Sequence, residues 1–500
     1  MASKPSTAWY ASTQLLSKSR PLSQSIPSPF KLSTQPAPPL TALWTASEIA
    51  EAINGETVKW GPPGTISTDT RTMNPSINQW FFAISGQNFD AHDFVSPDLY
   101  QKGCVGVIGR RVCENWDMGF VRFGFGDDSA TALVRMAKYA RERFNGCVVG
   151  VTGSVGKTTT RAMVALALER CGLVYQTIGN QNNRIGVGLS LIGIPGGAEM
   201  AVLELGMCRK GEILELARMC EPNVRVVLNV GAAHLENFGS LEEIADAKGE
   251  ILREVKAGDV CILNADDPLV SGLPVPPGVK KVFFGQRPGC DVRLLCAEAT
   301  NGGHGVKVVL ERGAEMVKFV ISSPGVHLAL NACAAAAVAT TLGVPLAQVG
   351  ESLSRFSPVH MRSELETAQN GIRIINDVYN ANPTSTTAAI SSLKAIDCSG
   401  KRVAILGDML ELGPTEIKAH EIVLNQCRDA RIALIALLGK RFLAAAENLN
   451  IAGNANVICS LNVNSLAWQI TPMLRSTDVV LVKGSRRMQM ERIVDAIKST

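Results

Sequence analysis

The sequence lacks any apolar run that could cross a lipid bilayer. Its apolar runs, such as 403–406 and 432–438, are far shorter than the roughly 20 residues that a membrane-spanning helix needs. Hydrophobic residues nevertheless make up 46% of the 500 residues, and charged residues only 19%. The composition therefore predicts a globular chain with ample material for buried cores and no membrane span. At about 150 residues per domain, the length suggests three domains.

The cysteines lack the spacing of a metal site or a disulfide framework. None of the 13 cysteines belongs to a CxxC pair, and no Cys/His cluster has the spacing of a zinc site. An odd number of scattered thiols is typical of a reducing compartment. Structural zinc is therefore not expected.

Acidic residues are absent from the first 47 positions, the first being Glu48. This segment is rich in Ser and Pro, contains no continuous apolar core of a secretory signal, and carries four cations, Lys4, Lys18, Arg20 and Lys31. We interpret residues 1–44 as a transit peptide of the plastid type, which predicts a location in the chloroplast stroma. A merely disordered tail is the alternative.

The leader also accounts for the net charge of the chain. Its four positive side chains equal the formal net charge of +4, so the remaining residues sum to zero. The basic excess is therefore no evidence for a nucleic-acid partner, and none is expected.

Beyond the leader, the pattern of apolar residues changes along the chain. Residues 45–53 predict a short helix that begins with a capping box of Thr45 and Glu48, and short strand-like runs follow. From Cys147, strand-like runs alternate with helical segments, which is typical of a mainly parallel sheet. A Gly-broken β-like stretch covers 282–321.

The strand–helix alternation begins again beyond Pro358, without a GxGxxG motif that would support a dinucleotide site. We therefore predict an α/β fold with three domains after the leader. They are a small α/β domain over 45–128, a central parallel-sheet domain over 129–357 and a Rossmann-like α/β domain over 358–500.

A Gly-rich loop follows the strand-like run CVVGV. It lacks the first Gly of a strict P-loop, because Val151 stands at that position. Glycines still let backbone N–H groups wrap phosphates, Lys157 can reach the β and γ phosphates, and Thr158 can ligate Mg²⁺. A tight strand–helix turn, the alternative, would not need Gly-Lys-Thr there. The predicted nucleotide-binding residues are Gly153, Ser154, Val155, Gly156, Lys157, Thr158 and Thr159.

Three further side chains beyond this loop are candidates. Glu204 closes the run MAVLEL, at the sheet edge where ligands bind in such folds, although a solvated carboxylate is the alternative. His234 lies in a Gly/Ala-rich loop, where a lone histidine is more often structural than a ligand. Lys248 lies on a helix whose charged face is equally compatible with an ordinary solvated lysine.

Five stretches together resemble the Mur ligase superfamily of ATP-dependent amide-bond-forming enzymes: TGSVGKTTT, LELGM, LNVGAAHLENFGS, IADAKGEI and LNADDP. The resemblance covers about residues 45–500. Further stretches resemble the members that join D-Ala-D-Ala to UDP-N-acetylmuramoyl-tripeptide, namely GNQNNRIGVGLSL, NDVYNANPTSTTAAI, AILGDMLELG, the downstream His420 and VLVKGSRRMQMERIV.

This resemblance implies an ATP-dependent peptide ligase. Such an enzyme would make the pentapeptide precursor of peptidoglycan through an acyl phosphate, releasing ADP and phosphate, and we expect it to be a monomer. Two alternatives are another Mur ligase or folylpolyglutamate synthase, and a non-catalytic plastid scaffold with the same fold.

The resemblance also implies roles for individual residues. Thr158 and Glu204 would hold one Mg²⁺, and His234 would hold a second together with Lys248, once CO₂ has carbamylated that lysine. The implied catalytic residues are Lys157, Lys248, His234 and Arg362. The implied contacts to the adenosine and γ-phosphate of ATP are His327, Asn331, Arg362, Asp377, Tyr379 and Asn380.

Substrate contacts are implied in the same way. The N-terminal domain would bind the uridine nucleotide through Ser67, Asp69, Arg71 and Gly86. Further implied substrate contacts are Asn180, Asn182, Asn183, Asn382, Asp408, Lys483 and Ser485, of which the last four are candidates for the dipeptide. The sequence departs from the family pattern at three places, which are Asn78-Gln79-Trp80 before the Phe-Phe run, Ala91 and Gly188.

Overall fold

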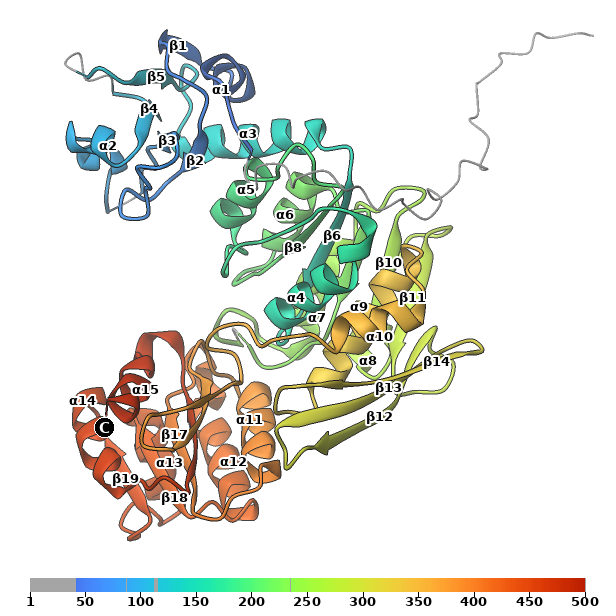
Figure 1. Ribbon diagram of the computed structural model, residues 1–500, viewed down its shortest axis with the longest axis vertical. Coiled ribbons are helices and arrows are strands. Elements are labelled where there is room, and N and C mark those ends of the chain that lie inside the picture. The colour runs from blue at the N-terminus through green and yellow to red at the C-terminus, as the bar shows by residue number, and fades with distance from the viewer. Residues whose placement is uncertain (1–41, 87, 112–115, 234, 500) are drawn as a thin grey trace, which may run out of the picture.

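The computed structural model describes residues 42–86, 88–111, 116–233 and 235–499 (Figure 1). These residues form three β-sheets with helices packed on them, so the predicted three-domain α/β fold is confirmed. Most of the predicted leader and the candidate ligand His234 lie outside the described residues. No helix within the described ranges is both long and apolar enough to span a membrane.

The N-terminal sheet has the strand order β1-β5-β4-β3-β2, and only its β1–β5 pair is antiparallel. The strands are β1 (Glu56–Lys59), β2 (Thr65–Ser67), β3 (Gln79–Phe82), β4 (Cys104–Gly109) and β5 (Gly119–Arg122). Helices α1 (Ala46–Ile53) and α2 (Asp98–Gln101) accompany them. The predicted capping box of α1 is confirmed, because the Glu48 N–H donates to Thr45 Oγ1 over 3.2 Å and the Thr45 N–H donates to Glu48 Oε2 over 2.9 Å.

Trp80, one of the departures from the family pattern, is fully buried in this sheet. Its indole Nε1–H donates to the Pro62 carbonyl over 3.0 Å. Gly106 on the adjacent strand β4 and Gly119 on the next strand β5 face its ring, and a Cβ there would lie 2.3 and 2.6 Å from indole carbons. The two glycines therefore provide the space that the indole occupies.

Helix α3 (Ser129–Arg143) joins the first two units. Asp128 caps its first turn by accepting a hydrogen bond from the Thr131 N–H over 2.6 Å. The helix packs against α1 on one side and against α5 (Arg184–Ile192) and α6 (Glu212–Cys220) on the other. One apolar core, which includes Ile49 and Met136, therefore runs from the N-terminal unit into the central one.

The central sheet has nine strands in the order β14-β13-β12-β11-β10-β9-β6-β8-β7. The strands from β7 to β12 pair in parallel, as the alternating pattern predicted. They are β6 (Cys147–Thr152), β7 (Val174–Gln176), β8 (Met200–Glu204), β9 (Val224–Val227), β10 (Val260–Asn264), β11 (Lys280–Gly285) and β12 (Val292–Thr300). The β-like stretch continues into two antiparallel strands, β13 (Gly305–Arg312) and β14 (Glu315–Ile321).

Helices cover both faces of the central sheet (Figure 1). Eleven of the 14 residues of the Ala-rich α9 (Leu328–Thr341) are buried, and α9 packs closely on α4 (Lys157–Ala167). Small alanine side chains let the two helices approach, which holds the start of α4 in place. The other central helices are α7 (Leu241–Gly249), α8 (Pro268–Ser271) and α10 (Leu346–Leu353).

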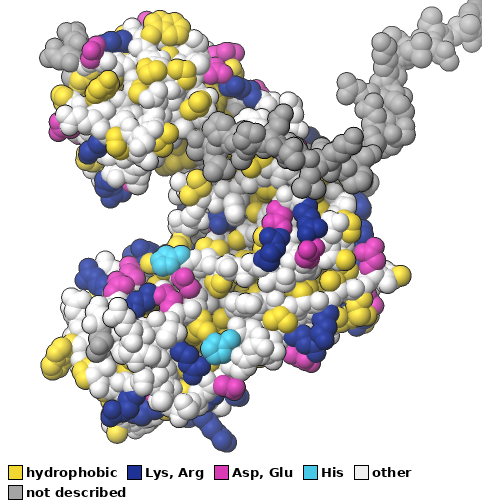
Figure 2. All heavy atoms as spheres, viewed as in Figure 1, with side chains coloured by type: hydrophobic (Ala, Val, Ile, Leu, Met, Phe, Trp, Pro, Cys, Tyr) yellow, Lys and Arg dark blue, Asp and Glu magenta, His cyan; other side chains and the backbone are white. Residues whose placement is uncertain are grey.

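The C-terminal sheet has the order β15-β16-β20-β17-β18-β19, and all pairs except β15–β16 are parallel. Its strands are β15 (Glu364–Thr367), β16 (Arg373–Asp377), β17 (Arg402–Gly407), β18 (Leu434–Leu438), β19 (Val457–Ser460) and β20 (Val479–Lys483). Its helices are α11 (Pro383–Ala395), α12 (Glu416–Asp429), α13 (Lys440–Asn448), α14 (Val463–Ile470) and α15 (Glu491–Lys498). Figure 2 shows a hollow between this unit and the N-terminal one, beside the central unit.

Candidate functional site

A cleft of about 1160 Å³ lies between the central and C-terminal units. The carboxyl ends of strands from both parallel sheets open into it, which is where ligands bind in folds of this kind. The sequence-predicted residues that line it are Gly153, Ser154, Val155, Gly156, Lys157, Thr158, Thr159, Asn180, Asn182, Asn183, Glu204, Lys248, His327, Asn331, Arg362, Asp377, Tyr379, Asn380, Asn382, Lys483 and Ser485.

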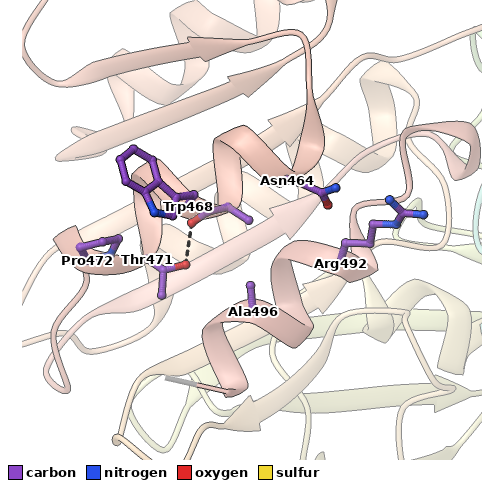
Figure 3. A pocket seen from close by; sticks show the side chains of 7 residues that line it. Asn464, Trp468, Thr471, Pro472, Arg492 and Ala496 are labelled. Carbon is purple, nitrogen blue, oxygen red and sulfur yellow. Dashed lines mark hydrogen bonds between the residues drawn. The ribbon is translucent and has the colours of Figure 1, made fainter.

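A second, shallower hollow of about 450 Å³ lies between α14 and α15 (Figure 3). Its lining includes Trp468 and Arg492 but none of the residues that the sequence singled out. The cleft is therefore the candidate functional site.

The conformation of the Gly-rich loop is fixed by its glycine backbone and by contacts with two asparagines. Gly156 has φ +82°, and a Cβ there would lie 2.7 Å from Asn331 Oδ1. Asn229, two residues after β9, accepts from the Val155 N–H over 2.9 Å and donates to the Val155 carbonyl over 3.1 Å. Helix α4 begins directly afterwards at Lys157, so its first N–H groups and its dipole face the cleft.

Lys157 has a polar environment suited to an anion. Its Nζ donates to the Gly153 carbonyl over 2.8 Å. Burial lowers the pKa of Lys157, Glu204 opposes this shift, and the positive charge of Arg362 lowers the pKa further. A phosphate between the two cations would relieve their repulsion.

Thr158 and Glu204 form an oxygen-rich pair at the base of the cleft. Thr158 Oγ1 donates to Glu204 Oε2 over 2.7 Å, and Asn182 Nδ2 donates to Glu204 Oε1 over 2.7 Å. Hydroxyl and carboxylate oxygens suit Mg²⁺, which takes few protein ligands and completes its shell with water and phosphate oxygens. The described residues contain no cluster of three His, Cys, Asp or Glu side chains that could hold a metal. The pair therefore fits a nucleotide-bound Mg²⁺ better than a protein-only cage.

Lys248 is almost completely buried, not solvated as its sequence context alone allowed. It lies at the end of α7 and lines the cleft. Burial lowers the pKa of its ammonium group well below the usual value, and the charge of Lys157 lowers it further. Compared with an exposed lysine, Lys248 is therefore more often in the neutral amine form, which is the nucleophilic form of lysine.

Arg362 reaches the cleft from the segment that enters the C-terminal unit. Its guanidinium lies 3.8 Å from the centre of the Tyr379 ring. Its two neighbours, Met361 and Ser363, have φ +63° and +51°, a left-handed conformation that costs about 1–2 kcal/mol per non-glycine residue. The Ser363 N–H donates to Asp377 Oδ1 over 3.2 Å, which ties this bend to β16.

Asp377 and Lys483 are paired with each other. Lys483 Nζ donates to Asp377 Oδ2 over 2.7 Å and to the Asn380 carbonyl over 2.8 Å. Lys483 is buried at the end of β20, directly beside the end of β16. The residues predicted for the ribose and for the dipeptide thus form one charged group at the same sheet edge.

Helix α11 also points its first turn into the cleft. Its cap, Asn382, accepts from the Ser385 N–H over 2.8 Å, and Ser385 Oγ accepts from the Asn382 N–H over 3.1 Å. Ser485 Oγ accepts from the Leu410 N–H over 2.9 Å, which joins the loop after β20 to the loop after β17. Two predicted substrate contacts therefore also organise the rim of the cleft.

The structure does not bring Asp408 into the cleft lining. Its two carboxylate oxygens accept from the N–H groups of Phe442, over 2.9 Å, and Arg441, over 3.1 Å, at the start of α13. His420 lies beneath the same loop, accepting from the Met409 N–H at Nε2 over 2.9 Å, and burial lowers its pKa. Both residues support the loop that carries Leu410 and Glu411 to the cleft.

The four residues predicted for the uridine nucleotide lie on the N-terminal unit, away from the cleft lining. Arg71 donates from Nε and Nη2 to the two oxygens of Asp69, over 2.9 and 2.7 Å, and these bonds lower the pKa of Asp69. The Asp69 N–H donates to Ser67 Oγ over 3.3 Å, and the Gly86 N–H donates to the Phe89 carbonyl over 2.8 Å. Three of the four predicted residues, Ser67, Asp69 and Arg71, therefore lie together in one turn.

Comparison with known proteins identifies the family of this chain. Residues 151–339 match the Mur ligase middle domain, and residues 361–486 match the Mur ligase glutamate ligase domain. The UDP-N-acetylmuramoyl-tripeptide–D-alanyl-D-alanine ligase of Bacillus subtilis is 33% identical over 465 residues, which cover 91% of this chain and 98% of that relative. This chain belongs to the Mur ligase family.

Solved structures of Mur ligases share the whole fold. The MurF crystal structure from Acinetobacter baumannii matches with a TM-score of 0.79 and 28% identity, covering 92% of this chain and all of that one. MurF from Thermotoga maritima, in complex with ADP, matches with a TM-score of 0.72 and 28% identity, covering 87% and 97% of the two chains.

Several residues that line the Mur ligase cleft were not predicted. They include Arg184, Cys208, Lys210, Asn229, Arg486 and Arg487. Asn229 had a usable signal, since it lies two residues after the end of β9, at the same sheet edge as Glu204. The cations lie in loops and first turns where the sequence pattern carries no comparable signal.

Replacing Lys483 by Met should destabilise the C-terminal unit. The change leaves Asp377 without its positive partner in a largely buried position, and breaking a buried ion pair from one side costs about 3 kcal/mol. Urea denaturation measures this loss in the free energy of unfolding. Lys440→Met, at an exposed position of the same unit, is the control. Equal losses in the two variants would contradict the importance of the pair.

Proposed function

We propose that this chain is an ATP-dependent ligase that joins D-Ala-D-Ala to UDP-N-acetylmuramoyl-tripeptide. The products would be the pentapeptide precursor of peptidoglycan, ADP and phosphate. The observation that carries this proposal is one cleft lined both by the P-loop and Glu204 and by Arg362 and Asp377 of the C-terminal unit. The similarity to the UDP-N-acetylmuramoyl-tripeptide–D-alanyl-D-alanine ligase of Bacillus subtilis and to the ADP complex of the Thermotoga maritima MurF supports it.

The first step activates a poor electrophile. The tripeptide carboxylate attacks the γ-phosphorus of ATP, a new O–P bond forms, and ADP leaves as the old O–P bond breaks. Negative charge spreads over the transferring phosphoryl group, so fixed positive charge is the main means of stabilising it. Lys157, Arg362 and the first N–H groups of α4 supply that charge in the cleft.

The second step forms the amide. The amine nitrogen of D-Ala-D-Ala attacks the carbonyl carbon of the acyl phosphate, and phosphate leaves from the tetrahedral intermediate with the proton lost by the amine. Asn382 and Ser485 at the start of α11 and after β20 are the proposed dipeptide contacts. Because they come from the C-terminal unit, closure of that unit on the central one would align the reactants.

Thr158 and Glu204 would hold one Mg²⁺, which when bound neutralises phosphate oxygens. His234 and a carbamylated Lys248 would hold a second. The lowered pKa of Lys248 supports this modification, because CO₂ reacts with the neutral amine. A carbamate also turns a cation into an oxygen ligand of the kind that Mg²⁺ prefers.

The ligase activity can be tested directly. We expect residues 44–500, supplied with ATP, Mg²⁺, bicarbonate and both peptide substrates, to form the UDP-linked pentapeptide, detected by mass spectrometry. Arg362→Ala should lower kcat/KM by about 10³-fold, in the range known for arginines that stabilise phosphoryl transfer. Arg428→Ala, at an exposed position on α12, should leave the rate unchanged.

The alternatives give different results in the same assay. Product with a free amino acid instead of the dipeptide would indicate another ligase of this family. ATP binding without product, whichever substrate is supplied, would favour a scaffold over an enzyme. Size-exclusion chromatography of the same preparation tests the proposed monomer.

Carbamylation of Lys248 has its own readout. With ¹³C-labelled bicarbonate, the protein should show a carbamate carbon signal in NMR, and Lys248→Met should abolish it. Because the pKa of Lys248 is lowered, the signal should already be present at a pH where ordinary lysines are fully protonated. A signal that persists in Lys248→Met would show that another amine is modified.

We further propose that residues 1–44 direct the chain to plastids, on the basis of their Ser- and Pro-rich, acid-free composition. A fluorescent protein fused behind these residues should coincide with chlorophyll fluorescence in plant cells. The same fluorescent protein without the leader is the control. Diffuse cytosolic fluorescence of the fusion would overturn the proposal.

A further inference from the structure

The loop between β8 and α6, residues 206–211, lines the cleft beside Glu204 and Lys248. It begins two residues after Glu204, the last residue of β8, and it ends at Gly211, the cap residue of α6. Gly211 has φ +92° and no side chain, so no side chain of the loop itself caps this helix. The first N–H groups of α6 therefore need an acceptor from elsewhere.

Glu250 supplies that acceptor from the segment that follows α7. The Gly211 N–H donates to Glu250 Oε1 over 2.8 Å and to Oε2 over 3.1 Å, and the Leu214 N–H donates to Oε2 over 3.2 Å. The side chain is only 1% exposed. A buried carboxylate that accepts several backbone N–H bonds is a strong and well-defined anchor. Glu250 stands two residues after Lys248, so the anchor and the cleft lysine share one short segment.

The other end of the loop is tied to the Thr158–Glu204 pair. The Gly206 N–H donates to the Asn182 carbonyl over 2.8 Å, and a Cβ at Gly206 would lie 2.8 Å from the side chain of Asn182. Asn182 in turn holds Glu204 Oε1. One chain of contacts thus runs from Glu250 through the loop to Asn182 and Glu204.

We propose that Glu250 is a positioning residue that sets the distance between Lys248 and Glu204. It does so by fixing the far end of the 206–211 loop, and it touches no substrate itself. The inference rests on the proposed ligase function only for its effect on rate, because the effect on the loop is a property of the free protein.

Glu250→Gln tests the proposal with almost no change of volume. The amide offers one oxygen where the carboxylate offers two, and its NH₂ group faces the N–H groups of Gly211 and Leu214. Amide hydrogen exchange in peptides covering 206–214 should become about tenfold faster, because the local opening is less costly. The kcat should fall about tenfold or more through misplacement of Glu204 and Lys248, while the KM for ATP stays within about twofold.

Asp478→Asn is the matched control. Asp478 is 2% exposed and accepts from the backbone N–H groups of Lys401, over 2.7 Å, and Arg475, over 2.9 Å, at the opposite end of β20 from the cleft. This variant should lower the thermal midpoint as Glu250→Gln does. It should leave kcat and exchange in 206–214 at the wild-type values.

The exchange rates and the kcat values of the two variants distinguish a positioning residue from a merely structural one. If Glu250→Gln and Asp478→Asn have the same exchange in 206–214, or if kcat is unchanged in both, Glu250 is only a structural residue. If the wild-type protein makes no product, the proposed function fails, but the exchange comparison still tests whether Glu250 holds the loop.

Discussion

The cleft depends on one electrostatic constraint, which is the crowding of several basic side chains, among them the buried Lys248, along its lining. Lys157 and Lys248 both have lowered pKa values, and Arg362 contributes to the shift of Lys157. Bringing like charges together where solvent is partly excluded is unfavourable unless an anion separates them. The surrounding structure keeps the charges there: α9 supports α4, the bend at Met361–Ser363 directs Arg362, and Tyr379 covers its guanidinium. Polyphosphate is the ligand that this arrangement is ready to accept.

Local patterns were enough to predict those features of the fold and of the site that a short segment determines alone. The P-loop, the strand end at Glu204 and the capping box at Thr45 depend on residues within a few positions of one another. The alternation of strands and helices likewise predicted two parallel sheets, because each βα unit carries its own apolar pattern. The family resemblance then named residues in the C-terminal unit that the cleft does contain.

Properties that depend on distant contacts could not be read in this way. Asp377 and Lys483 are 106 residues apart, and only the sheet order places their strands side by side. Asp408 sits in a highly specific motif, yet its oxygens are used by backbone groups of α13. Lys248 looked ordinary because its burial comes from elements packed around α7, not from its own helix. Helix α3 packs on both the N-terminal and the central unit, so its sequence does not mark to which domain it belongs.

Trp80 illustrates how such distant contacts constrain the history of a sequence. Its indole occupies the volume that any side chain at Gly106 or Gly119 would need. A tryptophan could therefore enter position 80 only in a chain that already had glycine at positions 106 and 119. Once it is there, neither glycine can change alone, and a return to a small residue at position 80 would leave a void. The three positions must evolve as a group, so the effect of a substitution at one of them depends on the other two.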